Sequence, residues 1–135
     1  MKMRQLMIVI VLLLAISGCT KYTTPRKVEK RLGEGTWRIT SFTMGTEVIT
    51  LNYAFYTFVF DNDGQVEVRE GTTVDGTWEV GNDKNPALLY LSFPAVDGLE
   101  YLSDDWQVLE MKKNLMKLKR NTNSSTTTLV TFAKQ

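Results

Sequence analysis

Few residues of this chain belong to the types that most often carry enzyme chemistry. Its 135 residues include no histidine and one cysteine, Cys19. Without imidazole, the chain lacks the usual general base of serine and cysteine hydrolases and the commonest metal ligand. A single cysteine cannot form an intramolecular disulfide. The chemistry that remains is that of carboxylates, which glycosidases use in pairs.

Two acidic motifs are candidates for such a pair. Asp61-Asn62-Asp63-Gly64 has the letters of a calcium loop, but the first ligand position would fall on Val59, which has no side-chain oxygen. A hairpin turn explains the same residues. Asp104 and Asp105 are adjacent, and neighbouring residues of a strand point to opposite faces, so we do not expect them to share a proton.

Other catalytic motifs are missing from the sequence. It contains no phosphate-binding glycine loop, no dinucleotide fingerprint and no Gly-x-Ser-x-Gly. Its 16 basic and 15 acidic residues give a net charge of +1, without the basic excess of a nucleic-acid-binding protein. We therefore predict a single domain that is not an enzyme, with no cofactor, no metal and no nucleic-acid partner.

The N-terminal residues predict export and lipid anchoring. Lys2 and Arg4 precede an apolar run, Leu6 to Ile16, which is far shorter than the ~20 residues of a membrane-spanning helix. Ile16-Ser17-Gly18-Cys19 then resembles the bacterial lipobox. The resemblance implies that residues 1–18 are a lipoprotein signal peptide and that Cys19 carries acyl chains such as palmitate. The alternative is a plain secretory signal with a chance cysteine.

The residue after the cysteine bears on location. Residue 20 is Thr and not Asp, so the inner-membrane retention signal of enterobacterial lipoproteins is missing. By that analogy we expect a protein of the cell envelope anchored in the outer membrane. The analogy leaves open whether the domain faces the periplasm or the cell surface.

Residues 19–34 are predicted to form the lipid-anchored tether and a short helix. Thr24 suits the N-cap, Pro25 the first helical position and Gly33 the end, with Val28 and Leu32 on one face. Four basic residues lie on this segment, Arg26, Lys27, Lys30 and Arg31. They either contact anionic lipid headgroups beside the anchor or form a solvated face of a helix that closes one end of the domain.

From residue 35 the pattern changes to short β-type runs separated by turn residues. We expect eight strands, at Thr36–Thr43, Phe55–Phe60, Gln65–Arg69, Gly76–Val80, Leu88–Phe93, Trp106–Met111, Leu115–Arg120 and Thr127–Ala133. Residues 44–54 are either a ninth strand or a loop across one end. Residues 35–135 are thus predicted to be an all-β domain, an eight-stranded antiparallel up-and-down barrel, with a β-sandwich as the alternative.

Gly35-Thr36-Trp37, directly after the short helix, is similar to the Gly-x-Trp signature of the lipocalin and calycin barrels. With Phe60–Gly64, Gly76-Thr77-Trp78 and Asp105–Val108, residues 33–135 resemble the small bacterial lipocalin-like lipoproteins. In those families an arginine of a late strand packs across the Trp, and the resemblance implies this role for Arg120 against Trp37. The motifs are short, and the second Gly-Thr-Trp at residues 76–78 departs from the pattern.

Two functions follow as hypotheses. In the first, the barrel binds a small apolar ligand, which enters near residues 44–54. The residues predicted to contact this ligand are Trp37, Tyr56, Phe58, Trp78, Trp106 and Phe132. In the second, the domain is a non-catalytic accessory subunit that docks on an envelope protein complex through exposed aromatic residues, namely Phe55, Tyr90, Phe93 and Tyr101.

Overall fold

The computed structural model describes residues 23–81, 86–121 and 125–135, and the predicted signal peptide and Cys19 lie outside them. Within these described residues, one α-helix, α2 (Pro25–Leu32), precedes nine strands and two short 3₁₀ helices. The strands are β1 (Trp37–Met44), β2 (Glu47–Val48), β3 (Thr57–Phe60), β4 (Gln65–Glu70), β5 (Thr72–Val80), β6 (Leu88–Ser92), β7 (Asp104–Met111), β8 (Leu115–Arg120) and β9 (Thr128–Lys134). The 3₁₀ helices are η1 (Thr50–Tyr53) and η2 (Leu99–Leu102).

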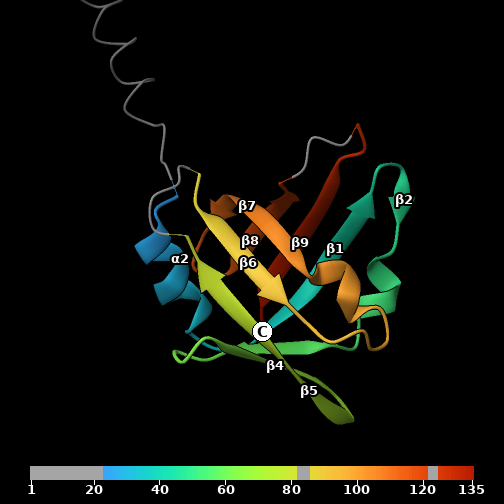
Figure 1. The fold of residues 1–135 in the computed structure, drawn as a ribbon, viewed down its shortest axis with the longest axis horizontal. Helices are drawn as coiled ribbons and strands as arrows, with labels where there is room; N and C mark the ends of the chain where they lie inside the picture. The colour runs from blue at the N-terminus through green and yellow to red at the C-terminus, as the bar shows by residue number, and fades with distance from the viewer. Residues whose placement is uncertain (1–22, 82–85, 122–124) are drawn as a thin grey trace, which may run out of the picture.

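Eight of the strands close into an antiparallel up-and-down barrel (Figure 1). The order runs from β1 through β3 to β9, and β9 pairs with β1 from Trp37↔Lys134 to Met44↔Thr128. This closure confirms the predicted barrel, and the β-sandwich alternative is wrong. The two-residue β2 extends β1 as a short hairpin beyond the barrel wall.

The pairing of β1 with β3 is the narrowest seam of the barrel. The two strands share one aligned pair, Trp37↔Phe58. Further along β1, residues that lead into η1 supply the missing hydrogen bonds. The Ile49 amide donates to the Phe42 carbonyl (2.9 Å), and the Phe42 amide donates to the Thr50 hydroxyl (3.0 Å). The ambiguous segment 44–54 is therefore a hairpin and a helical turn that complete the wall.

Helix α2 has the bounds predicted from its caps. The Thr24 hydroxyl accepts from the Lys27 amide (3.3 Å), and Pro25 opens the first turn. Val28 and Leu32 are fully buried where the helix packs on β5 and β7, so α2 covers one end of the barrel. Gly33 ends the helix with a right-handed φ of −71°, and a Cβ there would lie 2.9 Å from the Asn62 side chain.

Buried and more exposed positions alternate along the barrel strands. The inward positions are buried in every strand of the barrel, including Ile39, Phe60, Val66, Val68, Val80, Val108, Met116, Leu118 and Val130. Two strands begin earlier than predicted, β5 at Thr72 and β7 at Asp104. Gly71, with a φ of +71°, reverses the chain between β4 and β5, which lets this hairpin extend to Glu70↔Thr72.

The Asp61–Gly64 motif is a hairpin turn. The Asp61 carboxylate accepts hydrogen bonds from the amides of Asp63 (2.9 Å) and Gln65 (3.0 Å). Gly64 has a φ of +84°, which favours glycine. The side chain of Asp61 thus stabilises the reversal between β3 and β4, as the turn interpretation predicts.

Candidate functional site

The six residues predicted to contact a ligand are all buried, with exposed fractions of 9% or less. Five of them belong to a continuous series of aromatic rings that runs through the barrel. Neighbouring centroids in this series are 4.9–6.5 Å apart, mostly at steep angles. The order of contact is Trp106, Phe42, Tyr53, Tyr56, Phe58, Phe132, Phe60 and Trp78. The predicted binding residues therefore contact one another as a packed core.

The sixth residue, Trp37, lies at the end of the barrel covered by α2. Its indole N–H donates to the Leu32 carbonyl (3.2 Å), and the Lys134 ammonium lies 5.2 Å from the ring centroid. The prediction that Arg120 packs across Trp37 is wrong. Arg120 is on β8 at the opposite end, where its guanidinium lies 5.1 Å from the centroid of Trp106. The cause is register, because β8 pairs Arg120 with Trp106.

The segments that contain η1 and η2 lie at the end of the barrel opposite α2 (Figure 1). This end exposes large apolar side chains. We call this surface the apolar rim. It consists of Val48 (70% exposed), Leu51 (85%), Phe55 (79%), Val96 (38%) and Tyr101 (52%). These residues come from two segments, 48–55 and 96–101, which meet across the end of the barrel. Four aromatic residues were predicted to be exposed. Phe55 and Tyr101 are exposed, whereas Tyr90 is half-buried. The prediction is wrong for Phe93, which is buried against Gly76.

A cleft of about 390 Å³, here called the rim cleft, separates the two segments. One side is formed by Met44, Glu47, Ile49, Asn52 and Tyr53, and the other by Asp97, Gly98 and Tyr101. Two tyrosines hold the second side in place. The Tyr53 hydroxyl donates to the Gly98 carbonyl (2.7 Å), and the Tyr56 hydroxyl donates to the Asp97 carbonyl (3.1 Å). Asp97 itself has a φ of +49°, which is uncommon outside glycine.

The surroundings of Tyr53, in the rim cleft, and of the neighbouring Tyr56 favour the neutral form of these two side chains. Burial, followed by the nearby Glu100 carboxylate, raises the pKa of Tyr53 from 10.0 to about 12. Burial and the Glu70 carboxylate also raise the pKa of Tyr56. Both hydroxyls therefore keep their protons, and their hydrogen bonds to the 97–98 backbone, at all physiological pH values.

Acidic side chains surround the rim. Glu47 and Asp97 line the cleft, and Glu100, Asp104 and Asp105 follow along η2 and the start of β7. Arg120 offsets one of these charges. Its Nε lies 3.0 Å from Asp104 Oδ2, at an angle that makes the contact an ion pair and not a hydrogen bond. The rim end therefore combines apolar side chains with a surplus of negative charge.

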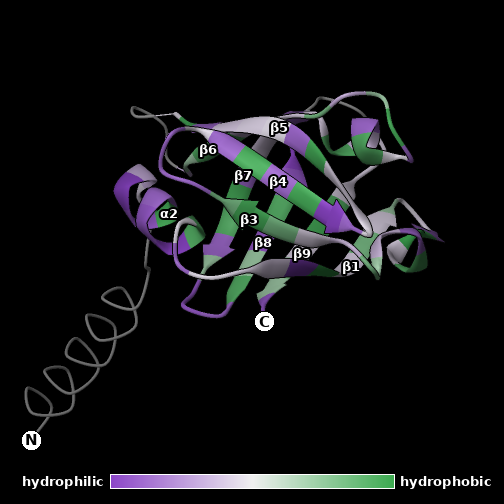
Figure 2. Ribbon diagram, turned by 90° about the horizontal axis from the view of Figure 1, so that it is seen from below, coloured by the Kyte–Doolittle hydropathy of each residue, from purple (hydrophilic) through white to green (hydrophobic). Residues whose placement is uncertain are grey.

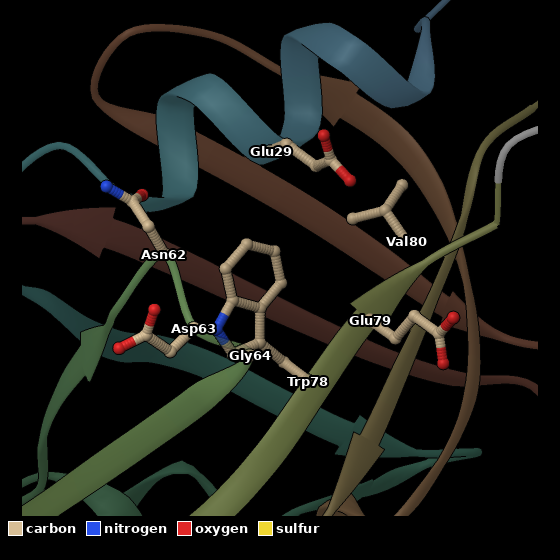
Figure 3. A pocket seen from close by; sticks show the side chains of 7 residues that line it. All are labelled: Glu29, Asn62, Asp63, Gly64, Trp78, Glu79 and Val80. Carbon is tan, nitrogen blue, oxygen red and sulfur yellow. The ribbon is translucent and has the colours of Figure 1, made fainter.

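A second cleft, of about 420 Å³, lies beside α2 (Figure 3). It is lined by Glu29, Asn62, Asp63, Gly64, Trp78, Glu79 and Val80. The Trp78 indole forms its floor and donates to the Asp61 carbonyl (2.9 Å). Figure 3 shows the carboxylates of Glu29, Asp63 and Glu79 on different sides of the Trp78 indole.

The described residues hold no group of three or more potential metal-ligating side chains. Asp104 and Asp105 diverge, since one pairs with Arg120 and the other is exposed. No helix in the described part of the chain is long and apolar enough to span a bilayer.

Comparisons with family models, curated proteins and solved structures found no match to this chain.

Two residues of the rim cleft were missed by sequence reasoning. Tyr53 falls in segment 44–54, where no regular alternation indicates which side chains are buried. Asp97 has a left-handed φ, and such a φ at a non-glycine residue has no reliable signal in sequence. The exposed Leu51 next to Tyr53 could have indicated a surface role, although single exposed leucines are common.

Proposed function

We propose that this protein is a lipid-anchored envelope protein with a lipocalin-like barrel, and that it acts as a non-catalytic accessory subunit. Its docking surface is the apolar rim. The observation that carries the proposal is the gathering of five large exposed apolar side chains at one end of the barrel. Exposed apolar side chains concentrated at one end of a domain are typical of an interaction site, and interface centres are rich in aromatic anchors.

The chemistry of the rim specifies the partner. Glu47 and Asp97 line the rim cleft, Glu100 lies beside it, and Leu51 and Phe55 project next to it. A partner segment that carries both apolar and basic side chains complements this surface. The partner we propose is therefore a basic, apolar segment of an envelope protein.

The anchor in this proposal is Cys19, and the membrane is the outer membrane. The support is the lipobox-like Ile16–Cys19 together with Thr20. Cys19→Ala is expected to move the protein from the membrane fraction to the soluble exported fraction, as measured by fractionation and immunoblotting. Retention of the variant in the membrane would contradict the lipid anchor.

The docking role is tested by photo-crosslinking in the native envelope. A photoreactive amino acid at Leu51 or Phe55 is expected to give a discrete protein adduct, which Glu47→Gln with Asp97→Asn weakens. The matched control is Leu109, an apolar residue of β7 that is 49% exposed on the barrel wall. Equal adducts from Leu109, or none from the rim, would contradict docking at the rim.

A small apolar ligand is the second candidate, and the rim cleft is the observation that favours it. Its volume lies within the range of small-molecule sites, and it borders residues 44–53, near the expected entrance. Mass spectrometry of protein purified without harsh detergent distinguishes the two functions. A co-purifying apolar molecule that Tyr53→Ala releases would favour the ligand.

A further inference from the structure

The helix dipole favours Lys30 and Arg31, which lie in the last turn of α2, but it does not explain the other two basic residues of this helix. Its first turn contains Arg26 and Lys27 and no acidic residue, although the positive end of a helix dipole favours acidic side chains. Arg26 lies four residues before Lys30, and Lys27 four residues before Arg31. Like charges at this spacing destabilise a helix by about 0.2–0.5 kcal/mol per pair. Within the described residues, none of the four forms an ion pair.

The exposed face of α2 is therefore cationic and its apolar face is already in use. Val28 and Leu32 are fully buried in the barrel, so the helix has no apolar stripe left to insert into a membrane or a groove. On a helical wheel, Arg26 and Lys30 point away from these two residues, and both are exposed. Figure 2 shows the hydrophilic colour of α2 at this end of the molecule.

Further lysines extend the cationic surface. The turn between β7 and β8 carries Lys112 and Lys113, and the Lys134 amide donates to the Asn114 carbonyl of this turn (3.0 Å). Lys134 in turn covers Trp37 at the helix end. Two of these lysines have acidic partners, because the Lys112 ammonium lies 2.8 Å from Glu110 and the Lys134 ammonium 4.0 Å from Glu34. Glu29, Asp63 and Glu79 line the cleft beside β5.

We propose that this end of the domain, formed by the outer face of α2 and the β7–β8 turn, binds the surface of a membrane rich in anionic phospholipid. The occupant follows from charge and from the path of the chain. The described chain begins at Thr23, next to the N-terminus of α2, and the predicted lipid attachment site is four residues earlier. Four residues span at most ~14 Å, so an anchored chain holds α2 close to the headgroups. In this respect the inference rests on the proposed anchor.

The proposed contact has two consequences. It is electrostatic, so it weakens as salt screens the charges. It also orients the domain, because a barrel that stands on its helix end presents the apolar rim, at the other end, away from the bilayer. The same contact would explain why the two ends differ in charge.

The test uses residues 23–135, which contain α2 and every residue of the described core and therefore form a complete folding unit. This fragment lacks Cys19, so its binding cannot come from acyl chains. The probes are vesicles of phosphatidylcholine alone and vesicles in which about a third of the lipid is phosphatidylglycerol. We expect sedimentation with the anionic vesicles at low ionic strength and release on adding about 0.5 M NaCl.

Variants locate the contact. Arg26→Gln with Lys30→Gln is expected to reduce the partition coefficient at least tenfold, since each cation near an anionic surface contributes about fivefold. The matched control, Arg69→Gln with Lys119→Gln, removes the same charge from β4 and β8 and is expected to have no effect. Glu29→Gln is expected to strengthen binding. Thermal melts of all variants verify that the fold is retained. We expect it to be retained because substitutions at exposed positions usually change stability little.

Three results would overturn the inference. The first is equal binding of the fragment to both kinds of vesicle. The second is a loss of binding in the control variant as large as the loss in the α2 variant. The third is binding to anionic vesicles that the α2 substitutions do not change. None of these depends on the lipid anchor, which Cys19→Ala tests in cells. Failure of the surface contact and failure of the proposed function are therefore distinguishable.

Discussion

The two ends of the barrel are closed by the same combination of groups. At the helix end, the Trp37 indole donates to the last residue of α2, and Lys134 covers the ring. At the rim end, the Trp106 indole donates to the Leu102 carbonyl at the end of η2 (2.9 Å), and Arg120 covers the ring. Each tryptophan lies near the start of the strand that follows the helix. A carbonyl that the helix leaves unpaired is thereby satisfied by the core.

The outer surfaces of these two closures differ completely. The helix end carries unpaired cations and buries the apolar residues of its helix, whereas the rim end exposes apolar side chains among carboxylates. The two tryptophan closures therefore explain how each end is held together, but they do not explain why the exposed residues of the two ends differ. We propose that the difference reflects what each end contacts.

The largest expected effect concerns the two buried tryptophans. Trp37→Ala and Trp106→Ala are each expected to lower the free energy of unfolding by about 3–5 kcal/mol, because each removes a fully buried ring and the donor to a helix carbonyl. Urea denaturation followed by circular dichroism measures both. Phe55→Ala, at an exposed ring of the rim, is the control and is expected to change little. A loss below about 1 kcal/mol at either tryptophan would show that the two closures are not equivalent.

The next largest effect is a pH dependence of stability that comes from Tyr53, at the rim end. Burial raises the pKa of Tyr53, at the rim, to about 12. In the unfolded chain this tyrosine ionises near pH 10, so between pH 10 and 12 the unfolded state binds fewer protons than the folded state. The contribution of this residue to stability is therefore fully present below pH 10 and is lost as the pH rises to 12.

Tyr53→Phe tests this dependence. At pH 7 the variant is expected to be about 1 kcal/mol less stable, because the Gly98 carbonyl loses its donor. Its additional loss between pH 10 and 12, measured by urea denaturation at each pH, is expected to be smaller than that of the wild type. Tyr101→Phe, at a half-exposed residue, is the control. Parallel curves for the wild type and Tyr53→Phe would contradict the origin of the pH dependence.

Much of the fold was predictable from the sequence because its signals are local. Thr24, Pro25 and Gly33 mark the helix through its caps, and the period-two alternation marks the buried face of each strand. The Asp61 turn is equally local, since the side chain bonds the amides of the next few residues. These features do not depend on which strands finally become neighbours.

The features that the sequence did not predict depend on distant pairing. The assignment of Arg120 to Trp37 was wrong because the register of β7 against β8 places it beside Trp106. Phe93 was expected at the surface, but the missing side chain of Gly76 makes room for its ring. Residues 44–54 lack alternation because they bridge the seam between β1 and β3 with η1. The rim cleft arises from that bridge and was therefore not predictable.

The smallest expected effect compares the two cations. Arg120→Met is expected to lower the free energy of unfolding by about 2 kcal/mol and Lys134→Met by about 1 kcal/mol or less. The reason is the number of partners. Arg120 contacts the Trp106 ring, forms an ion pair with Asp104 and donates to the Tyr101 carbonyl (2.5 Å). The Lys134 ammonium covers Trp37 and lies 4.0 Å from the half-exposed Glu34 carboxylate.

A double-mutant cycle separates the contributions at the rim. Asp104→Asn removes the charge partner of Arg120 and leaves the ring contact, so coupling between the two substitutions measures the ion pair. Added salt is expected to reduce this coupling only in part, because both side chains are mostly covered. Equal losses for Arg120→Met and Lys134→Met, with no coupling to Asp104, would mean that the ring contact alone matters. In that case the two closures would be equivalent in energy as well as in geometry.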